Sequence, residues 1–166
     1  MPRRLILMRH AKSEWADASV RDIDRPLNER GSRDAPRMGK LLRDKSICPA
    51  LIISSDAVRA LTTAQLVARE LGYPAERIRT NHALYLASPD TLLEVLSSEG
   101  DDYSDVMLVA HNPGMTELAN RIVAKRIDNL PTCGVFMIET DLPGWGALKG
   151  TPGSFAGFLS PKQNLS

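Results

Sequence analysis

The 166-residue sequence is poor in cysteine and has no long hydrophobic run. Its two cysteines, Cys48 and Cys133, lie beside apolar stretches, so we expect buried thiols in a reducing compartment rather than a disulfide framework. No apolar run approaches the ~18 residues that a membrane-spanning helix needs. The apolar stretch before Arg9 is also too short for the core of a signal peptide. These absences predict a cytoplasmic protein that does not enter a membrane.

The sequence also lacks an excess of charge of either sign. Its 21 basic and 20 acidic residues leave a net charge of +1, which gives no reason to expect a nucleic acid or an anionic membrane as partner. Any affinity for anions must then arise from a few residues that lie together. A length of 166 residues, 43% hydrophobic and 25% charged, is typical of one globular domain, here residues 1–166.

Several motifs that carry well-known chemistry are absent. There is no glycine-rich nucleotide loop, and Ser54 and Ser55 do not stand in the Gly-x-Ser-x-Gly pattern of serine hydrolases. The three histidines are scattered, no Cys-x-x-Cys pair occurs, and the carboxylates lack the spacing of metal ligands. We therefore expect no metal site, and we assign no role to His82.

Short apolar runs alternate with helical patterns along the chain. An uninterrupted apolar run is typical of a strand covered on both faces, whereas the helical patterns repeat every 3.6 residues. Strands are predicted at 5–8, 51–53, 106–110 and 134–139, with a short edge strand at 78–80, and helices at 29–44, 57–71, 90–98 and 115–125. This alternation predicts an α/β fold with a mostly parallel sheet.

Two parts of the chain give a weaker pattern. Gly31 and Pro36 stand in the first turns of the first predicted helix, so we expect that helix to start irregularly. The segment after Trp145 is rich in glycine, proline and serine and gives no clear prediction.

Polar residues follow three of the predicted strands. Arg9 and His10 end the first, the segment from Ser54 to Arg59 follows the second, and His111 follows the third. In parallel sheets, ligands bind beyond the carboxyl ends of the strands. We therefore expect these side chains to meet in one pocket.

The four side chains suit the transfer of a phosphoryl group. A neutral imidazole such as that of His10 can attack phosphorus, provided that its other nitrogen donates to a backbone carbonyl and so fixes the tautomer. The guanidinium groups of Arg9 and Arg59 match the negative oxygens of a phosphoryl group in shape and charge. His111 can donate a further hydrogen bond, and the helix beginning near Met115 has an N-terminus that favours anions.

Other residues are candidates for binding the substrate. Ser13 and Asn112 could add neutral donors to the pocket. Residues 12–27 are polar and form a long loop, in which Arg21 or Arg25 could steer the surface of a phosphoprotein.

Three blocks of sequence, 7–13, 54–60 and 109–114, occur in an order that resembles the histidine phosphatase superfamily, the phosphoglycerate-mutase-like proteins. With residues 24–31 and His111-Asn112-Pro113, the chain looks most like the SixA-type phosphohistidine phosphatases, over about residues 4–139. The resemblance implies a three-layer α/β/α sandwich and a phosphatase that needs no metal or organic cofactor. It also implies that His10 accepts the phosphoryl group and that Arg9, Arg59 and His111 complete the pocket.

The sequence departs from the superfamily at the proton donor. Members that act on esters carry a glutamate before the third strand or an aspartate after the second histidine, but residues 82–89 contain no carboxylate and Asn112 follows His111. An alkoxide leaving group needs a strong acid, whereas the imidazole that leaves phosphohistidine is easily protonated. The departure therefore favours a phosphoramidate substrate, unless Asp90, Glu94 or Glu117 reaches the pocket.

Chain length favours the same substrate. Only 51 residues separate Arg59 from His111, which leaves little chain for a lid, and an open site can admit a histidine carried by another protein. The leading hypothesis is thus a phosphatase that removes phosphate from a histidine of a partner protein through phospho-His10. The alternatives are a phosphatase of small phosphate esters and a non-catalytic module that binds a phosphorylated ligand.

Overall fold

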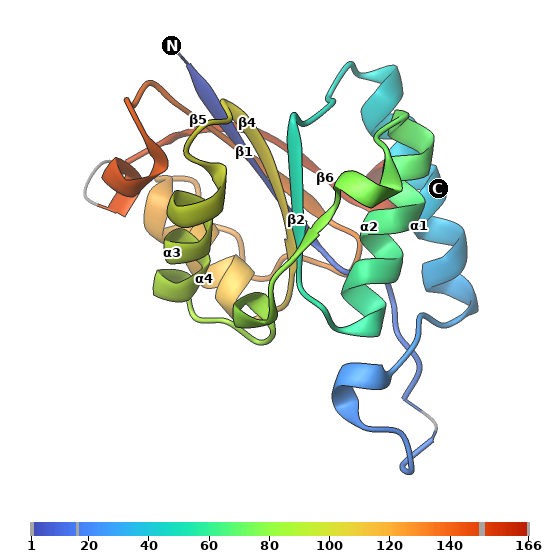
Figure 1. The fold of residues 1–166 in the computed structure, drawn as a ribbon. Helices are drawn as coiled ribbons and strands as arrows, with labels where there is room; N and C mark the ends of the chain where they lie inside the picture. Colours follow the sequence, from blue (N-terminus) through green and yellow to red (C-terminus); the bar gives the residue numbers. More distant parts are fainter. Residues whose placement is uncertain (1, 16, 150–151, 166) are drawn as a thin grey trace.

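A computed structural model describes residues 2–15, 17–149 and 152–165, and a six-stranded sheet lies at its centre (Figure 1). The strand order is β3-β2-β4-β1-β5-β6. The strands are β1 (Arg3–Arg9), β2 (Leu51–Ser54), β3 (Arg79–Thr80), β4 (Asp105–Ala110), β5 (Val135–Thr140) and β6 (Ser154–Leu159). The helices are α1 (Glu29–Asp44), α2 (Val58–Leu71), α3 (Pro89–Gly100), α4 (Gly114–Ile122) and α5 (Pro161–Asn164), with 3₁₀ turns η1 (Asp22–Asp24), η2 (Ala75–Arg77), η3 (His82–Leu84) and η4 (Trp145–Lys149).

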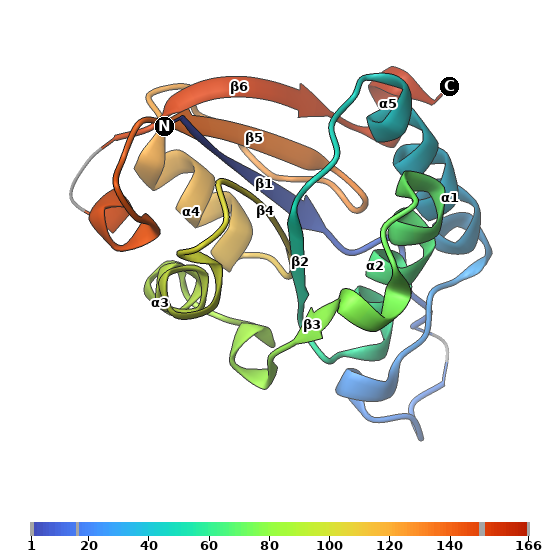
Figure 2. The ribbon, with the colours of Figure 1, turned by 45° about the horizontal axis from the view of Figure 1, so that its top comes forward.

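The sheet is parallel over four strands and antiparallel at one side. Strands β3, β2, β4 and β1 run parallel, β5 is antiparallel to β1, and β6 is antiparallel to β5. Helices α1 and α2 cover one face and α3 and α4 the other, which both ribbon views show (Figures 1 and 2). The predicted α/β/α sandwich with a mostly parallel sheet is therefore confirmed.

Alternate residues of the central strands divide between two cores. Leu5 and Leu7 of β1 face the core under α3 and α4, whereas Ile6 and Met8 face the core under α1 and α2. Strands β2, β4 and β5 divide in the same way. Because both faces are buried, every position from 5 to 8 must be apolar, which explains the uninterrupted run.

Helix α1 starts regularly, so the expectation of an irregular start is wrong. The side chain of Asn28 caps the helix by accepting from the N–H of Gly31 at 2.9 Å. Pro36 lies inside the helix. The carbonyl that it leaves without an intrahelical donor belongs to Ser32, an exposed residue at which water can take the place of the missing N–H.

The C-terminal part differs most from the predictions. Strand β6 was not predicted, and α4 ends at Ile122 rather than at Lys125. The amide of Asn120 accepts from the N–H of Ile127 and donates to its carbonyl, so it closes a turn that competes with further helix.

The prediction of two buried thiols holds for one of them. Cys133 is buried, but Cys48 is exposed, in the connection between α1 and β2. No helix of the described residues is long and apolar enough to cross a membrane.

Candidate active site

The ends of three neighbouring parallel strands bring the predicted side chains together. The N–H of His10 donates to the carbonyl of Ala110 at 3.2 Å, and the N–H of Ser55 donates to that of Val109 at 2.9 Å. These bonds continue the sheet one residue past the strands and so fix the backbone positions of His10 and Ser55. The rings of His10 and His111 consequently lie 5.2 Å apart, centroid to centroid.

A cavity of about 260 Å³ lies at this edge of the sheet. It contains most of the residues predicted from the sequence, together with Asp22 and a few neighbours. Its lining residues are Arg9, His10, Lys12, Ser13, Trp15, Asp22, Arg25, Arg59, Leu86, His111, Asn112 and Thr132. Arg21 is not among them, because it is exposed and its Nε bonds the carboxylate of Asp24 at 2.8 Å.

His10 has the tautomer that a nucleophile needs. Its Nδ1 lies 2.8 Å from the carbonyl oxygen of Ala11, which can only accept, so Nδ1 carries the proton and Nε2 carries the lone pair. The N–H of Ala11 in turn donates to the hydroxyl of Thr63 on α2. Burial lowers the pKa of His10 to about 4, and nearby Arg59, Arg9 and Arg25 act in the same direction against the bond to Ala11. The ring is therefore neutral at pH 7.

His111 is held by the hydroxyl of Ser55. The Nε2 of His111 lies 2.8 Å from Ser55 Oγ, which also accepts from the N–H of Ala57 at 3.2 Å. Ser55 Oγ can donate its own proton to Nε2 while it accepts from Ala57, and the neutral ring then carries its single proton on Nδ1. Burial lowers the pKa of His111 to about 3, with help from His10 and Arg59. The ring is neutral, and its Nδ1 is buried without a partner.

The two arginines also keep buried donors without a partner. Arg9 donates through Nη1 to the carbonyl of Leu130, and Arg59 donates through Nη1 and Nη2 to Asp22. The Nε atoms of both are buried and unpaired. Burial, and then the charge of Arg59, lowers the pKa of Arg9. A buried donor without an acceptor is costly, so these groups suit a bound anion.

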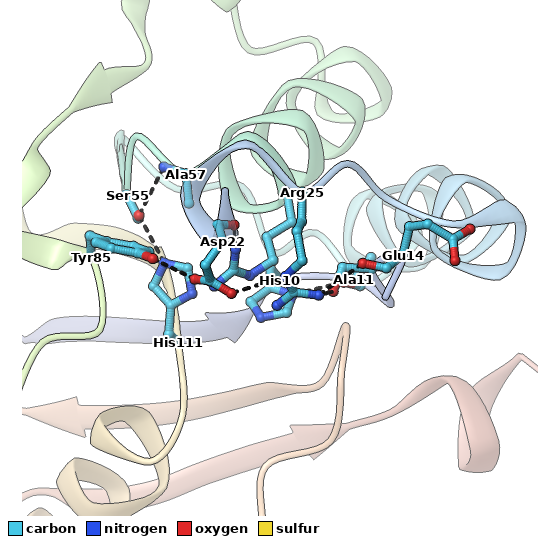
Figure 3. Close-up of polar contacts among 11 residues, drawn as sticks. His10, Ala11, Glu14, Asp22, Arg25, Ser55, Ala57, Tyr85 and His111 are labelled. Atoms are coloured by element: carbon cyan, nitrogen blue, oxygen red, sulfur yellow. Dashed lines mark hydrogen bonds and ion pairs between the residues drawn. The ribbon is translucent and has the colours of Figure 1, made fainter. Parts of the chain in front are cut away.

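Asp22 occupies a central position that the sequence did not reveal. Its carboxylate accepts from Arg59, from Arg25 at 2.9 Å and from the hydroxyl of Tyr85 (Figure 3). The bond from Tyr85 is the largest cause that holds the pKa of Asp22 well below its ordinary value, and Arg25 and Arg59 contribute. Asp22 is therefore a carboxylate at neutral pH and does not serve as a proton donor there.

Residues 12–15 and 17–27 fold around Arg25. This side chain is buried, and its Nη1 donates to the hydroxyl of Ser13 at 2.8 Å and to the carbonyl of Glu14 at 3.0 Å. Ser13 and Leu27 also form a bridge across the base of the loop. Two residues predicted to bind substrate, Ser13 and Arg25, thus support the cavity wall as well as lining it.

Asn112 lines the cavity but uses its amide within the protein. Its Oδ1 accepts from the N–H and the hydroxyl of Thr116, and its Nδ2 donates to Asn129 and Leu130. Asn112 therefore accepts from an N–H in the first turn of α4 and holds the segment before β5.

The carboxylates considered as proton donors lie elsewhere. Asp90 pairs with Arg121 at 2.7 Å, which lowers the pKa of its carboxyl group. Glu94 and Glu117 are exposed, and neither is among the described residues that line the cavity.

Two further residues of the site, Ser55 and Tyr85, differ in how clearly the sequence pattern marks them. Ser55 follows β2 directly, so the strand-end rule that led to His10 could have assigned it a role. The rings of Tyr85 and His111 lie nearly perpendicular, with centroids 5.5 Å apart, but Tyr85 stands in a weakly patterned segment. No group of three or more metal-binding side chains occurs within 2–15, 17–149 and 152–165.

The chain is similar in sequence to a protein family and to several known proteins. The family model described as histidine phosphatase superfamily (branch 1) matches residues 5–83. An uncharacterised chloroplast protein of Arabidopsis thaliana is 32% identical over 98% of this chain and 80% of its own length. An uncharacterised protein of Mycobacterium tuberculosis is 32% identical over 93% of this chain and its whole length.

A solved structure gives the same result for the whole fold. The crystal structure of a candidate phosphohistidine phosphatase, SixA of Agrobacterium tumefaciens, superposes with a TM-score of 0.82 at 30% identity. The superposition covers 97% of this chain and 99% of that one.

Proposed function

Because the chain belongs to the histidine phosphatase superfamily, we propose that it removes a phosphoryl group from a histidine of a partner protein through a covalent phospho-His10 intermediate. The observation that carries the proposal is a nucleophile in the same cavity as residues whose nitrogens have no hydrogen-bond partner. The neutral ring of His10 presents the lone pair of Nε2, and three buried nitrogens, on Arg9, Arg59 and His111, have no partner. The residues that carry these nitrogens all line the cavity, and guanidinium and imidazole groups are strong donors to a phosphoryl group.

The first step transfers the phosphoryl group. Nε2 of His10 forms a bond to phosphorus while the P–N bond of the substrate breaks, and the bonding electron pair leaves with the substrate imidazole, which takes a proton from water. The guanidinium groups of Arg9 and Arg59 and the Nδ1–H of His111 stabilise the negative equatorial oxygens. The carbonyl of Ala11 stabilises the positive charge that develops on the His10 ring.

The second step releases phosphate. Water attacks phosphorus, the bond to Nε2 breaks, and its electron pair returns to His10 as the lone pair, while the proton lost by water leaves with phosphate or solvent. Neither step needs a metal ion, because guanidinium groups supply the positive charge. Neither needs a strong acid, which is consistent with an Asp22 held as a carboxylate.

The test uses a phosphorylated phosphotransfer domain as substrate. We expect the wild-type protein to release phosphate and, when quenched rapidly in alkali, to carry an acid-labile phosphoryl group on His10. His10→Ala should lose both. Phosphate release that survives His10→Ala would exclude the covalent mechanism.

A panel of small phosphate esters tests the alternative substrate class. Turnover of esters well above that of the phosphoprotein would make the protein a small-molecule phosphatase instead. Phosphate binding without turnover of either substrate would leave a binding module.

A further inference from the structure

Two large apolar side chains are exposed at the mouth of the cavity. Trp15 is 71% exposed and Leu86 is 55% exposed, and both line the cavity that holds His10. Apolar surface in contact with water is unfavourable, since burial would gain hydrophobic free energy. Both apolar side chains border the same polar cavity, and exposed apolar surface beside a ligand-binding groove is a feature of surfaces that another molecule covers.

The backbone of Leu86 is strained. Its φ is +50°, in the left-handed region that bulky side chains rarely adopt. The preceding Tyr85 packs against His111 and bonds Asp22, so the turn directs one side chain into the site and the next into solvent. Backbone strain of this kind persists only where the surrounding structure imposes it, and such residues cluster at active sites and ligand-binding sites.

Trp15 is fixed in place by a buried cation. The guanidinium carbon of Arg25 lies 3.7 Å from the centroid of the indole ring. Arg25 is itself held by Asp22 and Ser13, so one face of the ring rests on a rigid support while most of the side chain is open to solvent. A tryptophan held in this way loses little conformational entropy when a partner covers it.

The two side chains reach the cavity from separate segments of the chain. Trp15 lies in the loop after β1, and Leu86 lies in the turn after η3. The cavity between is strongly basic, since Arg9, Lys12, Arg25 and Arg59 line it against the single carboxylate of Asp22 among its described residues. A phosphoryl anion fits the cavity, and apolar groups around it would meet Trp15 and Leu86.

We propose that Trp15 and Leu86 form an apolar rim that docks a folded partner protein around its phosphohistidine, on a surface where apolar side chains flank that histidine. This inference rests on the proposed function. A cavity of about 260 Å³ has room for the phosphorylated side chain, so the rest of the substrate must lie outside, against the rim. A free phosphorylated small molecule would leave the rim in water.

The test compares a phosphotransfer domain with free phosphohistidine as substrates of Trp15→Ala and Leu86→Asn. Asparagine tolerates the left-handed backbone, so Leu86→Asn removes the apolar side chain without adding strain. We expect each variant to lose about tenfold more kcat/KM on the phosphoprotein than on free phosphohistidine, through a raised KM, as loss of one buried apolar contact implies. Phe155→Ala is the matched control: Phe155 is an exposed apolar residue on β6, outside the cavity, and both activities should stay unchanged.

A binding measurement separates this inference from the proposed function. In a His10→Ala background, Trp15→Ala should weaken binding of the phosphorylated domain about tenfold. Rim-dependent binding without turnover by the wild type would contradict the proposed function and uphold the rim. Equal losses of kcat/KM on both substrates, or unchanged binding of the phosphorylated domain, would contradict the docking role of the rim. A higher kcat/KM on free phosphohistidine than on the phosphoprotein would identify a small-molecule substrate.

Discussion

Arg59 combines a positive charge, a planar guanidinium group and a buried donor that has no partner. Its two terminal nitrogens bond Asp22, and its buried Nε has no partner. Lysine would keep the charge but lose the planar fork and the Nε donor. We expect Arg59→Lys to lower kcat/KM for a phosphohistidine substrate by a factor on the order of 10²–10³, the usual cost of one transition-state donor.

The control for this prediction is Arg21→Lys. Arg21 is exposed, pairs with Asp24 and does not line the cavity, so its kinetics should match those of the wild type. Steady-state phosphate release by both variants makes the comparison. If the two variants lost activity equally, the proposed role of Arg59 in stabilising the transition state would be refuted.

The buried histidines should make the free energy of unfolding depend on pH. The pKa values of His10 and His111 are lowered to about 4 and about 3, so between pH 4 and 6.5 the folded protein binds fewer protons than the unfolded chain. Stability therefore falls as pH falls through this window, by about 1 kcal/mol per histidine between pH 7 and 5.5.

Urea denaturation at pH 7 and 5.5 measures this effect. The double variant His10→Asn/His111→Asn should lose most of the difference between the two pH values. A wild type equally stable at both would contradict the assignment of two neutral buried rings.

At the scale of residues, the sequence predicted the strand-end side chains and missed those that meet by tertiary folding. Arg9, His10 and His111 follow apolar runs whose ends must lie together in a parallel sheet. Asp22 reaches Tyr85 across 63 positions of sequence, and no local pattern marks such a contact. Trp15 was likewise invisible, because its place depends on how the loop folds over Arg25.

Helix α1 and the segment after β1 approach each other at Gly31. A Cβ at this position would lie 2.1 Å from the carbonyl oxygen of Lys12, which also accepts from the N–H of Asn28. Backbone cannot rotate away as a side chain can. We expect Gly31→Ala to lower the free energy of unfolding by about 1–3 kcal/mol, although alanine favours helices.

Ser32→Ala provides the comparison for this prediction. Ser32 is the next residue of the helix and is exposed, so its substitution should be neutral or slightly stabilising in urea denaturation. A stabilising Gly31→Ala would mean that helix and loop are not in close contact.

At the scale of elements, the sequence predicted buried strands more accurately than exposed ones. Strands β1, β2 and β4 are covered on both faces, which produces apolar runs that cannot be mistaken for amphipathic patterns. Strand β6 was missed because it lies at the edge of the sheet, where several of its residues are exposed and the sequence signal of a strand is weak. The end of α4 depends on a side-chain turn at Asn120, which no helical period encodes.

At the scale of the whole molecule, one thiol lies on the surface and the other lies in the interior. Cys48 is exposed, whereas Cys133 is buried and burial raises the pKa of its thiol. The N–H of Cys133 donates to the carbonyls of Arg9 and His10, so exposing this residue breaks the wall of the cavity. We expect a thiol reagent to modify Cys48 rapidly and Cys133 only when the protein opens.

Inorganic phosphate should protect Cys133. A ligand that binds only the closed protein slows labelling by a factor of about 100 at 100 times its dissociation constant. Mass spectrometry of the Cys48→Ser variant follows the single remaining thiol with and without phosphate. Labelling of Cys133 at the rate of Cys48, or no effect of phosphate, would be inconsistent with this geometry.

The sequence contains two tryptophans, and the fold places them in opposite environments. Trp145 is fully buried beside α3, whereas Trp15 stands in water with one face on a guanidinium group. The protein therefore contains its own pair of fluorophores. Emission from Trp15 would report binding at the cavity that it lines, while emission from Trp145 would report whether the interior stays intact.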